Sequence, residues 1–226
     1  MHNVGVRTVC NILGHLASKF QQANNNLITI DKARDDLRTD LASKAPHFFA
    51  WGQFVNLDHL LSFLLETPLP TMQSELTCQN AHMTTLHVMH TCLIHSNNLN
   101  GQSIQSWMAN PQDSSYPPCT ICHTPRTRHL RLLYSVPFLV FEFSNENTSL
   151  SANLIITVLG DQRHYTLKGI IYYGNEHFTS HIISNDNMVW YHDGMTTGPH
   201  MVPQGPLSNL MTCRNRHASV AIYTLL

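Results

Sequence analysis

The spacing of the apolar residues changes near Pro70, and this change restricts the fold more than any other feature of the chain. In residues 9–20, 33–41 and 57–65, apolar side chains recur every three or four positions, as on one face of a helix. Beyond Pro70 they recur at every second position of short stretches, which is the period of a half-buried strand. Helices followed by strands are typical of an α+β fold with an antiparallel sheet.

Capping and helix-breaking residues set the expected ends of the helices. The polar run 21–26 ends the first helix, and Asp31 is expected to cap the second. Pro46 lies beyond the end of that second helix. Asn56 is expected to cap the third helix, which Pro68 stops because proline cannot continue a helix.

The second part of the pattern predicts strands joined by polar loops. Leu86, Val88 and Ile94 lie on one parity of a Thr-rich run and predict one strand, whereas residues 97–118 are expected to form mainly loop. A loop rich in Gly and Pro is expected over 194–206. Further strands are expected at residues 130–134, 138–143, 154–158, 165–173, 177–184, 189–192 and 218–226.

The composition describes a chain that can form a core but carries few charges. Hydrophobic residues make up 42% of the 226 residues, and charged residues make up 12%, about half the roughly 25% that is usual. The formal net charge of -1 gives no reason to expect nucleic acid or a membrane surface as a partner. No apolar run approaches the ~20 residues that cross a bilayer, and the first residues lack the order of a signal peptide. We therefore expect an intracellular protein, of the cytoplasm or nucleus, whose 6 cysteines are thiols or metal ligands.

Two short segments have the spacing of metal ligands. Cys119 and Cys122 form a Cys-x-x-Cys pair directly after two prolines, and Cys78 and His82 form a second short-spaced pair upstream. Together they predict a tetrahedral zinc site of three cysteines and one histidine. The alternative is that Cys78 is a buried apolar residue and His82 a surface residue. Other histidines that could replace His82 as the ligand are His87, His90 and His123.

Residues 165–194 predict consecutive strands with reactive side chains at their ends. His177 starts one strand and Asp193 follows the next, so the two can meet across neighbouring strands. Such a pair suits a general base and the carboxylate that orients it. An ordinary surface hairpin is the alternative, since Asp-Gly favours turns. His181 and His192, in the same stretch, are expected at the surface.

Five pieces of the sequence, in this order, resemble one known family. They are residues 51–65 (WGQFVNLDHLLSFLL), 74–82 (SELTCQNAH) with 118–122 (PCTIC), 133–143 (LYSVPFLVFEF), 165–180 (YTLKGIIYYGNEHFTS), and 190–193 (WYHD) with 218–223 (ASVAIY). These pieces are similar to a helix, the two halves of the zinc-binding fingers, a palm strand, the histidine box and the acid-bearing segment with the final strand. The family that contains these parts is the ubiquitin-specific proteases, which are papain-like cysteine peptidases.

The resemblance implies a papain-like fold in a single domain over residues 1–226. Residues 1–70 would form an N-terminal helical thumb, and residues 71–226 would form zinc-linked fingers and an antiparallel palm sheet. The activity implied is the hydrolysis of bonds at the C-terminal tail of ubiquitin or a ubiquitin-like protein, which would lie between thumb and palm. By their positions in the motifs, His177 would be the general base and Asp193 the residue that orients it. The zinc would be structural.

The chain departs from the family's pattern at several positions. Glu176 stands before His177 where the family has Gly, and Glu142 stands where it has Arg. The family's nucleophile box is not cleanly present. In that box the cysteine must open a helix, because the helix dipole lowers the pKa of the thiol. Cys10 is the candidate nucleophile, since an amphipathic helix follows it. The alternative is that Cys10 is a core residue of that helix and that this N-terminally truncated chain begins downstream of the true box.

Three functions remain open on the sequence alone. The first is a thiol-dependent hydrolase of ubiquitin C-terminal peptide or isopeptide bonds. The second is a domain of the same fold that binds ubiquitin, or survives as a relic, without catalysis. The third is an unrelated zinc-stabilised interaction domain.

Overall fold

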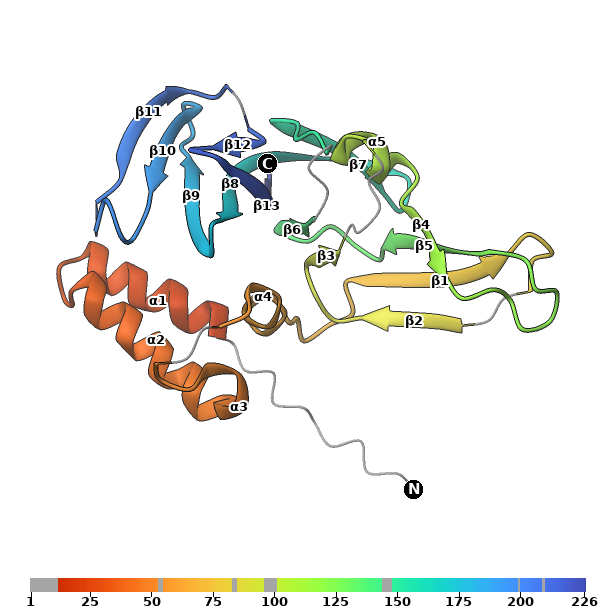
Figure 1. The fold of residues 1–226 in the computed structure, drawn as a ribbon, viewed down its shortest axis with the longest axis horizontal. Helices are drawn as coiled ribbons and strands as arrows, with labels where there is room; N and C mark the ends of the chain where they lie inside the picture. The colour runs from red at the N-terminus through yellow and green to blue at the C-terminus, as the bar shows by residue number, and fades with distance from the viewer. Residues whose placement is uncertain are drawn as a thin grey trace. The chain divides into compact units, whose positions relative to one another are not determined.

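The chain forms two compact units, Met1–Pro68 and Leu69–Leu226. The computed structural model describes residues 12–52, 55–82, 85–95, 101–143, 148–198, 200–208 and 210–226. Figure 1 shows that the first unit is built of helices and the second mainly of strands. Cys10 lies outside the described residues. Within the described ranges, no helix is long and apolar enough to cross a membrane.

The described part of the first unit contains helices whose apolar faces meet in a small core. The helices are α1 (Ile12–Asn24), α2 (Ile30–Lys44), α3 (Pro46–Phe49) and α4 (Leu57–Leu64). Leu41, Ala45 and Phe49 are buried at the centre, where the ring centroids of Phe49 and Phe63 lie 5.4 Å apart. The helical periodicity is thus confirmed, but α1 continues to Asn24 through the polar residues that were expected to end it.

Side-chain caps begin two of these helices. The side chain of Asn56 accepts a hydrogen bond from the backbone N–H of Asp58 at 2.9 Å, so the predicted cap of α4 is confirmed. The predicted cap of α2 is wrong. The hydroxyl of Thr29 accepts from the N–H of Lys32 at 3.1 Å, and Asp31 lies inside the first turn. An acidic residue suits either place, because both lie at the positive end of the helix dipole.

The described part of the second unit contains two sheets. Its strands are β1 (Met72–Cys78), β2 (Thr85–Met89), β3 (Leu93–His95), β4 (Gln112–Tyr116), β5 (Arg126–Leu132), β6 (Phe138–Glu142), β7 (Asn153–Val158), β8 (Asp161–Gly174), β9 (His177–Ile183), β10 (Met188–His192), β11 (Val202–Pro206), β12 (Thr212–Cys213) and β13 (Arg216–Leu225). A short helix, α5 (Ile104–Ala109), packs against β7. The smaller sheet has the order β2-β1-β5-β4 and is antiparallel throughout. The larger sheet has the order β11-β10-β9-β8-β13-β6-β3, with β12 beside β13 and β7 beside β8.

Several predicted strands and loops are wrong. The run with Leu86, Val88 and Ile94 is two strands in different sheets, because β2 ends before Ile94 and β3 pairs in parallel with β6. Residues 97–118 include α5 and β4, and residues 194–206 include β11. The sequence of β11 contains prolines, which cannot donate to a ladder, and the strand accordingly lies at the edge of the sheet.

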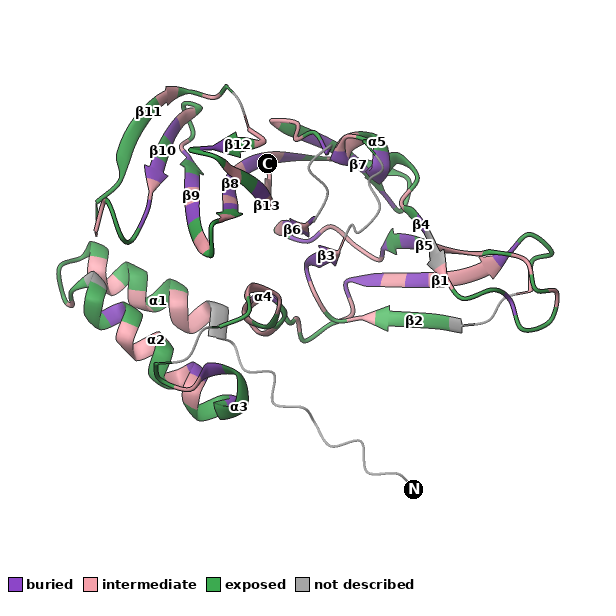
Figure 2. Ribbon diagram, viewed as in Figure 1, coloured by how far each residue is buried: buried purple, intermediate pink, exposed green. Residues whose placement is uncertain are grey.

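The core of the second unit is one cluster of buried side chains from both sheets and α5. Figure 2 shows buried positions alternating with more exposed ones along β9 and β10. Tyr165, Tyr172 and Tyr223 are fully buried, and each hydroxyl donates to a backbone carbonyl at 2.9–3.0 Å. These bonds let large rings fill the core without leaving a buried polar atom unpaired.

A two-residue turn joins β8 to β9. Gly174 pairs with His177 across the hairpin, and the two residues between them, Asn175 and Glu176, have φ of 55° and 57°. Positive φ at both turn positions matches the right-handed twist of a hairpin and favours Asn or Gly. Glu176, which stands where the family pattern has Gly, therefore carries backbone strain at the position directly before His177.

We expect Glu176→Gly to raise the free energy of unfolding by about 0.5–1 kcal/mol. Relief of a left-handed conformation, worth roughly 1–2 kcal/mol, outweighs the larger chain entropy of an unfolded glycine. Urea denaturation measures the difference. Asn175→Gly is the matched control and should gain less, because asparagine tolerates positive φ. A loss of stability in Glu176→Gly would contradict this account of the turn.

Candidate active site and metal centre

His177 and Asp193 lie side by side at one end of the β9–β10 pair. His177 is the first residue of β9, and Asp193 directly follows β10. Because the two strands are antiparallel, the start of one and the end of the other come to the same edge. The His177 Nε2 and the Asp193 Oδ1 are 2.8 Å apart. The structure thus brings together the two residues that the sequence singled out.

The carboxylate of Asp193 is buried and fully engaged. Its side chain is 3% exposed. Oδ2 accepts a hydrogen bond from the Tyr191 hydroxyl at 3.0 Å, and Oδ1 also accepts from the backbone N–H of Met195 at 2.9 Å. Burial by itself raises the pKa of Asp193, but the hydrogen bonds from His177 and these donors outweigh it and hold the pKa below its ordinary value. Asp193 is therefore a carboxylate at neutral pH.

This charge state fixes the tautomer of His177. A carboxylate can only accept hydrogen bonds, so the Nε2 of His177 must carry the proton that Asp193 accepts. In neutral imidazole the other nitrogen, Nδ1, then has a free lone pair. Within the described ranges, Nδ1 has no hydrogen-bond partner, and the side chain is 23% exposed. The ring is thus arranged to take a proton at Nδ1.

Tyr191 was not identified from the sequence as part of this site. It precedes Asp193 by two residues, so the alternation of side chains along an extended chain brings both to the same face. The guanidinium of Arg214 stacks over the ring of Tyr191 at 4.0 Å from its centroid. The parity of the strand was the signal that could have indicated Tyr191.

His181 belongs to a buried chain of hydrogen bonds. The hydroxyl of Tyr172 donates to a backbone carbonyl, so its oxygen accepts from Nδ1 of His181 at 2.9 Å. The Nε2 of His181 then accepts from the thiol of Cys213, 3.3 Å away. The expectation that His181 lies at the surface is wrong, because Cys213 and Tyr172 supply partners that the sequence alone did not reveal. His192 is only partly buried.

We expect protonation of His181 to destabilise the fold. Burial, and then the nearby Arg214, lower the pKa of His181 below the unfolded value of 6.5. Stability is therefore full above that value and falls as the pH drops through the folded pKa, by at most about 1.4 kcal/mol per pH unit. Urea denaturation between about pH 7.5 and about pH 5.5 measures this slope.

His181→Gln should show a shallower slope than the wild-type protein, whatever its stability at neutral pH. The exposed His164→Gln is the control and should keep the wild-type slope. Equal slopes for wild type and His181→Gln would show that His181 contributes nothing to the pH dependence.

The four predicted metal ligands form one cluster in the smaller sheet. The ligand atoms of Cys78, His82, Cys119 and Cys122 all lie within 4.8 Å of one another. The sulfurs of Cys78 and Cys122 are 3.4 Å apart, and the Cys119 sulfur lies 3.8 Å from the His82 Nδ1. Zinc–sulfur bonds of about 2.3 Å in a tetrahedron separate two sulfurs by about 3.8 Å. The donor set and its spacing fit a zinc ion, and His82, rather than another histidine, completes it.

Two turns present these ligands. Cys78 ends β1, and the N–H of Ala81 bonds back to its carbonyl at 2.9 Å. The N–H of His123 bonds to the carbonyl of Cys119 at 2.8 Å, which curls the chain so that the Cys119 and Cys122 sulfurs face the same point. Figure 1 shows the loops after β1 and before β5 together at the far end of the smaller sheet. The cluster thus joins two hairpin ends that are distant in sequence.

The environment prepares Cys122 to bind a metal. Its thiol contacts the hydroxyl of Thr124 at 3.1 Å. Hydrogen bonds from the Thr124 side chain and backbone lower the pKa of Cys122 to about 5. The pKa of Cys119 is also lowered, first by the backbone N–H groups of Cys122 and Ile121. Both residues therefore favour the thiolate, the form that binds zinc.

We expect the purified protein to contain about one zinc ion per chain. His82→Ala and Cys122→Ser should each lower the zinc content and the melting temperature, because each removes one of four ligands. Elemental analysis by mass spectrometry and thermal unfolding measure the two effects. His123→Asn is the control, since His123 adjoins the cluster and asparagine accepts its φ of 56°. A folded wild-type protein free of zinc would contradict this expectation.

Comparisons with known proteins reveal similarity only at the level of structure. No model of a known protein family matches the sequence, and no curated protein matches it. A chain of the SAGA DUB module Ubp8/Sgf11/Sus1/Sgf73 bound to monoubiquitin matches with a TM-score of 0.57 and 10% identity, over 100% of this chain and 68% of that one.

Two further structures give the same result. The SAGA DUB module bound to ubiquitin aldehyde has a TM-score of 0.57 and 10% identity, over 100% of this chain and 69% of that chain. The yeast SAGA DUB module with a variant Sgf73 has a TM-score of 0.56 and 10% identity, over 100% and 68%. The chain therefore has a mixed α+β fold, with large antiparallel sheets and a cluster of three cysteines and a histidine, that resembles solved DUB modules.

Proposed function

We propose that this chain is a ubiquitin-specific-protease-like domain that hydrolyses peptide or isopeptide bonds at the C-terminus of ubiquitin or a ubiquitin-like protein. The observation that carries the proposal is the 2.8 Å contact between His177 Nε2 and Asp193 Oδ1. The pair lies in a fold similar to that of DUB modules solved with monoubiquitin or ubiquitin aldehyde. A base with one nitrogen held by a buried carboxylate and the other available is the arrangement that activates a thiol.

Each residue of the pair has a distinct role in the proposed reaction. His177 Nδ1 takes the proton of the attacking thiol, and the thiolate adds to the carbonyl carbon of the scissile bond. The C–N bond breaks as the imidazolium returns that proton to the leaving amine, which leaves a thioester. Water, deprotonated by the same Nδ1, then hydrolyses the thioester and frees the thiol. Asp193 accepts from Nε2 throughout and stabilises the imidazolium.

We take Cys10 as the thiol of this proposal, because the other cysteines of this sequence have other surroundings. Three of the 6 cysteines belong to the metal cluster. Burial raises the pKa of Cys92 to about 11, which keeps it a neutral thiol. Cys213 is buried and hydrogen-bonded to His181. Cys10 is the cysteine that remains, and it precedes α1 in the sequence. The proposal requires Cys10 to open a helix, because the helix dipole there lowers the pKa of a nucleophilic thiol.

The metal cluster has a structural role in this proposal. Cys78, His82, Cys119 and Cys122 would hold a zinc ion, and four protein ligands leave no open position for substrate or water. The ion would join the β1–β2 end of the smaller sheet to the β4–β5 end, where the chain has few apolar residues to pack.

Turnover of ubiquitin carrying a fluorogenic amide at its C-terminus tests the proposal. Cys10→Ala and His177→Ala should each lower kcat/KM by about 100-fold to 10,000-fold, because each removes one partner of the proton transfer. Asp193→Asn should also lower it, since the amide can offer Nε2 a donor and favour the wrong tautomer. His164→Ala, an exposed histidine of β8, is the control and should keep full activity.

Full activity in Cys10→Ala would assign the thiol elsewhere, and full activity in His177→Ala would overturn the proposal.

A second candidate function is a non-catalytic ubiquitin-binding domain. This function is favoured because each cysteine that the structure describes either belongs to the metal-ligand cluster or is buried, so none of them is placed as a free nucleophile. Binding of ubiquitin by a wild-type protein that shows no turnover would support this second function. If the protein shows neither ubiquitin binding nor turnover, the remaining function is that of a zinc-stabilised interaction domain.

A further inference from the structure

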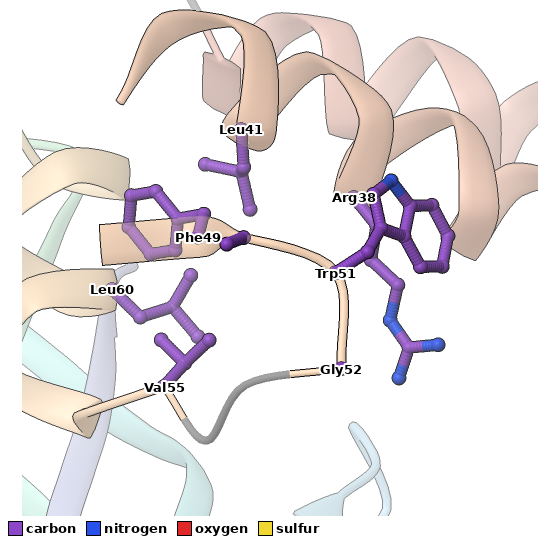
Figure 3. A pocket seen from close by; sticks show the side chains of 8 residues that line it. Arg38, Leu41, Phe49, Trp51, Gly52, Val55 and Leu60 are labelled. Carbon is purple, nitrogen blue, oxygen red and sulfur yellow. The ribbon is translucent and has the colours of Figure 1, made fainter. Parts of the chain in front are cut away.

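The helical unit contains an apolar pocket that the proposed function does not use. The pocket has a volume of about 510 Å³ and lies among α2, α3, the turn after α3 and α4. Figure 3 shows Leu41, Phe49 and Leu60 on one side of it, with Trp51 and Arg38 together on the other. Cavities of roughly 300–1,000 Å³ with mainly apolar walls are typical of small-molecule sites.

Among the described residues that line the pocket, Arg38 is the one that carries a charge. Its guanidinium lies 3.9 Å from the carboxylate of Asp35, which Arg34 holds more closely, at 2.9 Å. It also lies 5.9 Å from the ring centroid of Trp51, the usual range of a cation–π contact. Among the ion pairs of the described residues, Arg38 has the one with Asp35 at 3.9 Å, so its positive charge at the pocket is loosely paired.

Trp51 leaves a large apolar surface in contact with water. Its side chain is 59% exposed although it forms one wall of the pocket. Val55, on the other side of the turn, is also exposed. Tryptophan and arginine are enriched among the residues that contribute most to binding, because their interactions strengthen when a bound partner excludes water from them. A ligand in this pocket would cover the Trp51 ring, and a negatively charged group on the ligand would lie at the Arg38 guanidinium.

We propose that this pocket binds a small apolar molecule that carries one carboxylate. The apolar part lies against Leu41, Phe49 and Leu60, and the carboxylate pairs with the Arg38 guanidinium. Among the lining residues that the structure describes, the polar side-chain groups are the guanidinium of Arg38 and the indole of Trp51. The site is independent of the proposed hydrolase activity, and its test does not depend on turnover.

Isothermal titration calorimetry with decanoate and decyltrimethylammonium tests this site. The two probes share the same tail and differ in the sign of the head group. The wild-type protein should bind decanoate with a dissociation constant below about 1 mM and bind the cation more weakly. Arg38→Gln should weaken decanoate by roughly tenfold, because the charge-assisted hydrogen bond is lost, and should remove the preference between the probes.

Lys44→Gln is the matched control, since Lys44 is an exposed cation of the same helix that does not line the pocket. It should bind both probes as the wild type does, which excludes a general effect of net charge. Three results would overturn the proposal: no binding of decanoate to the wild type, equal binding of the two probes, or equal loss in Lys44→Gln and Arg38→Gln.

Discussion

The register of β8, β9 and β10 is the constraint on which the candidate active site depends. His181 pairs with Ile170 on one side and with Tyr191 on the other, and its ring is bonded to Tyr172 and Cys213. A slip of one residue would turn every side chain of β9 to the opposite face and carry His177 away from Asp193. The buried hydrogen bonds of His181 oppose such a slip, because breaking them would leave polar groups unpaired in the core. His181, which has no proposed chemical role, thus helps to keep His177 beside Asp193.

The metal-ligand cluster and the His177–Asp193 pair are built by the same means. In each, the ends of antiparallel strands bring the side chains together, and turns with positive φ stand beside them. Ala81 and His123, at φ of 55° and 56°, serve the cluster, and Glu176, at 57°, precedes the histidine of the pair. Strain of this kind persists only where the surrounding structure over-determines it. In the cluster, a metal ion would supply part of that determination.

The sequence predicted what local patterns encode and missed what distant contacts decide. The two-residue period of the strands correctly placed His177 and Asp193 at adjoining ends, and the cysteine spacing found the metal-ligand cluster. The burial of His181 could not be predicted, since its partner Cys213 lies 32 residues away with no motif linking them. β11 was not predicted because proline and glycine favour loops. Its prolines are compatible with a strand because β11 lies at the edge of the sheet. The pocket beside Trp51 arises from helix packing and has no signal in the sequence.

We have proposed that His177 and Asp193 serve a thiol that attacks the C-terminus of ubiquitin. The most direct measurement is covalent capture by ubiquitin that carries an electrophile in place of its last residue, with the modified residue identified by mass spectrometry. We expect one adduct, on Cys10, that forms much more slowly in His177→Ala. An absent adduct, or one whose rate is unchanged in His177→Ala, would contradict the proposed mechanism.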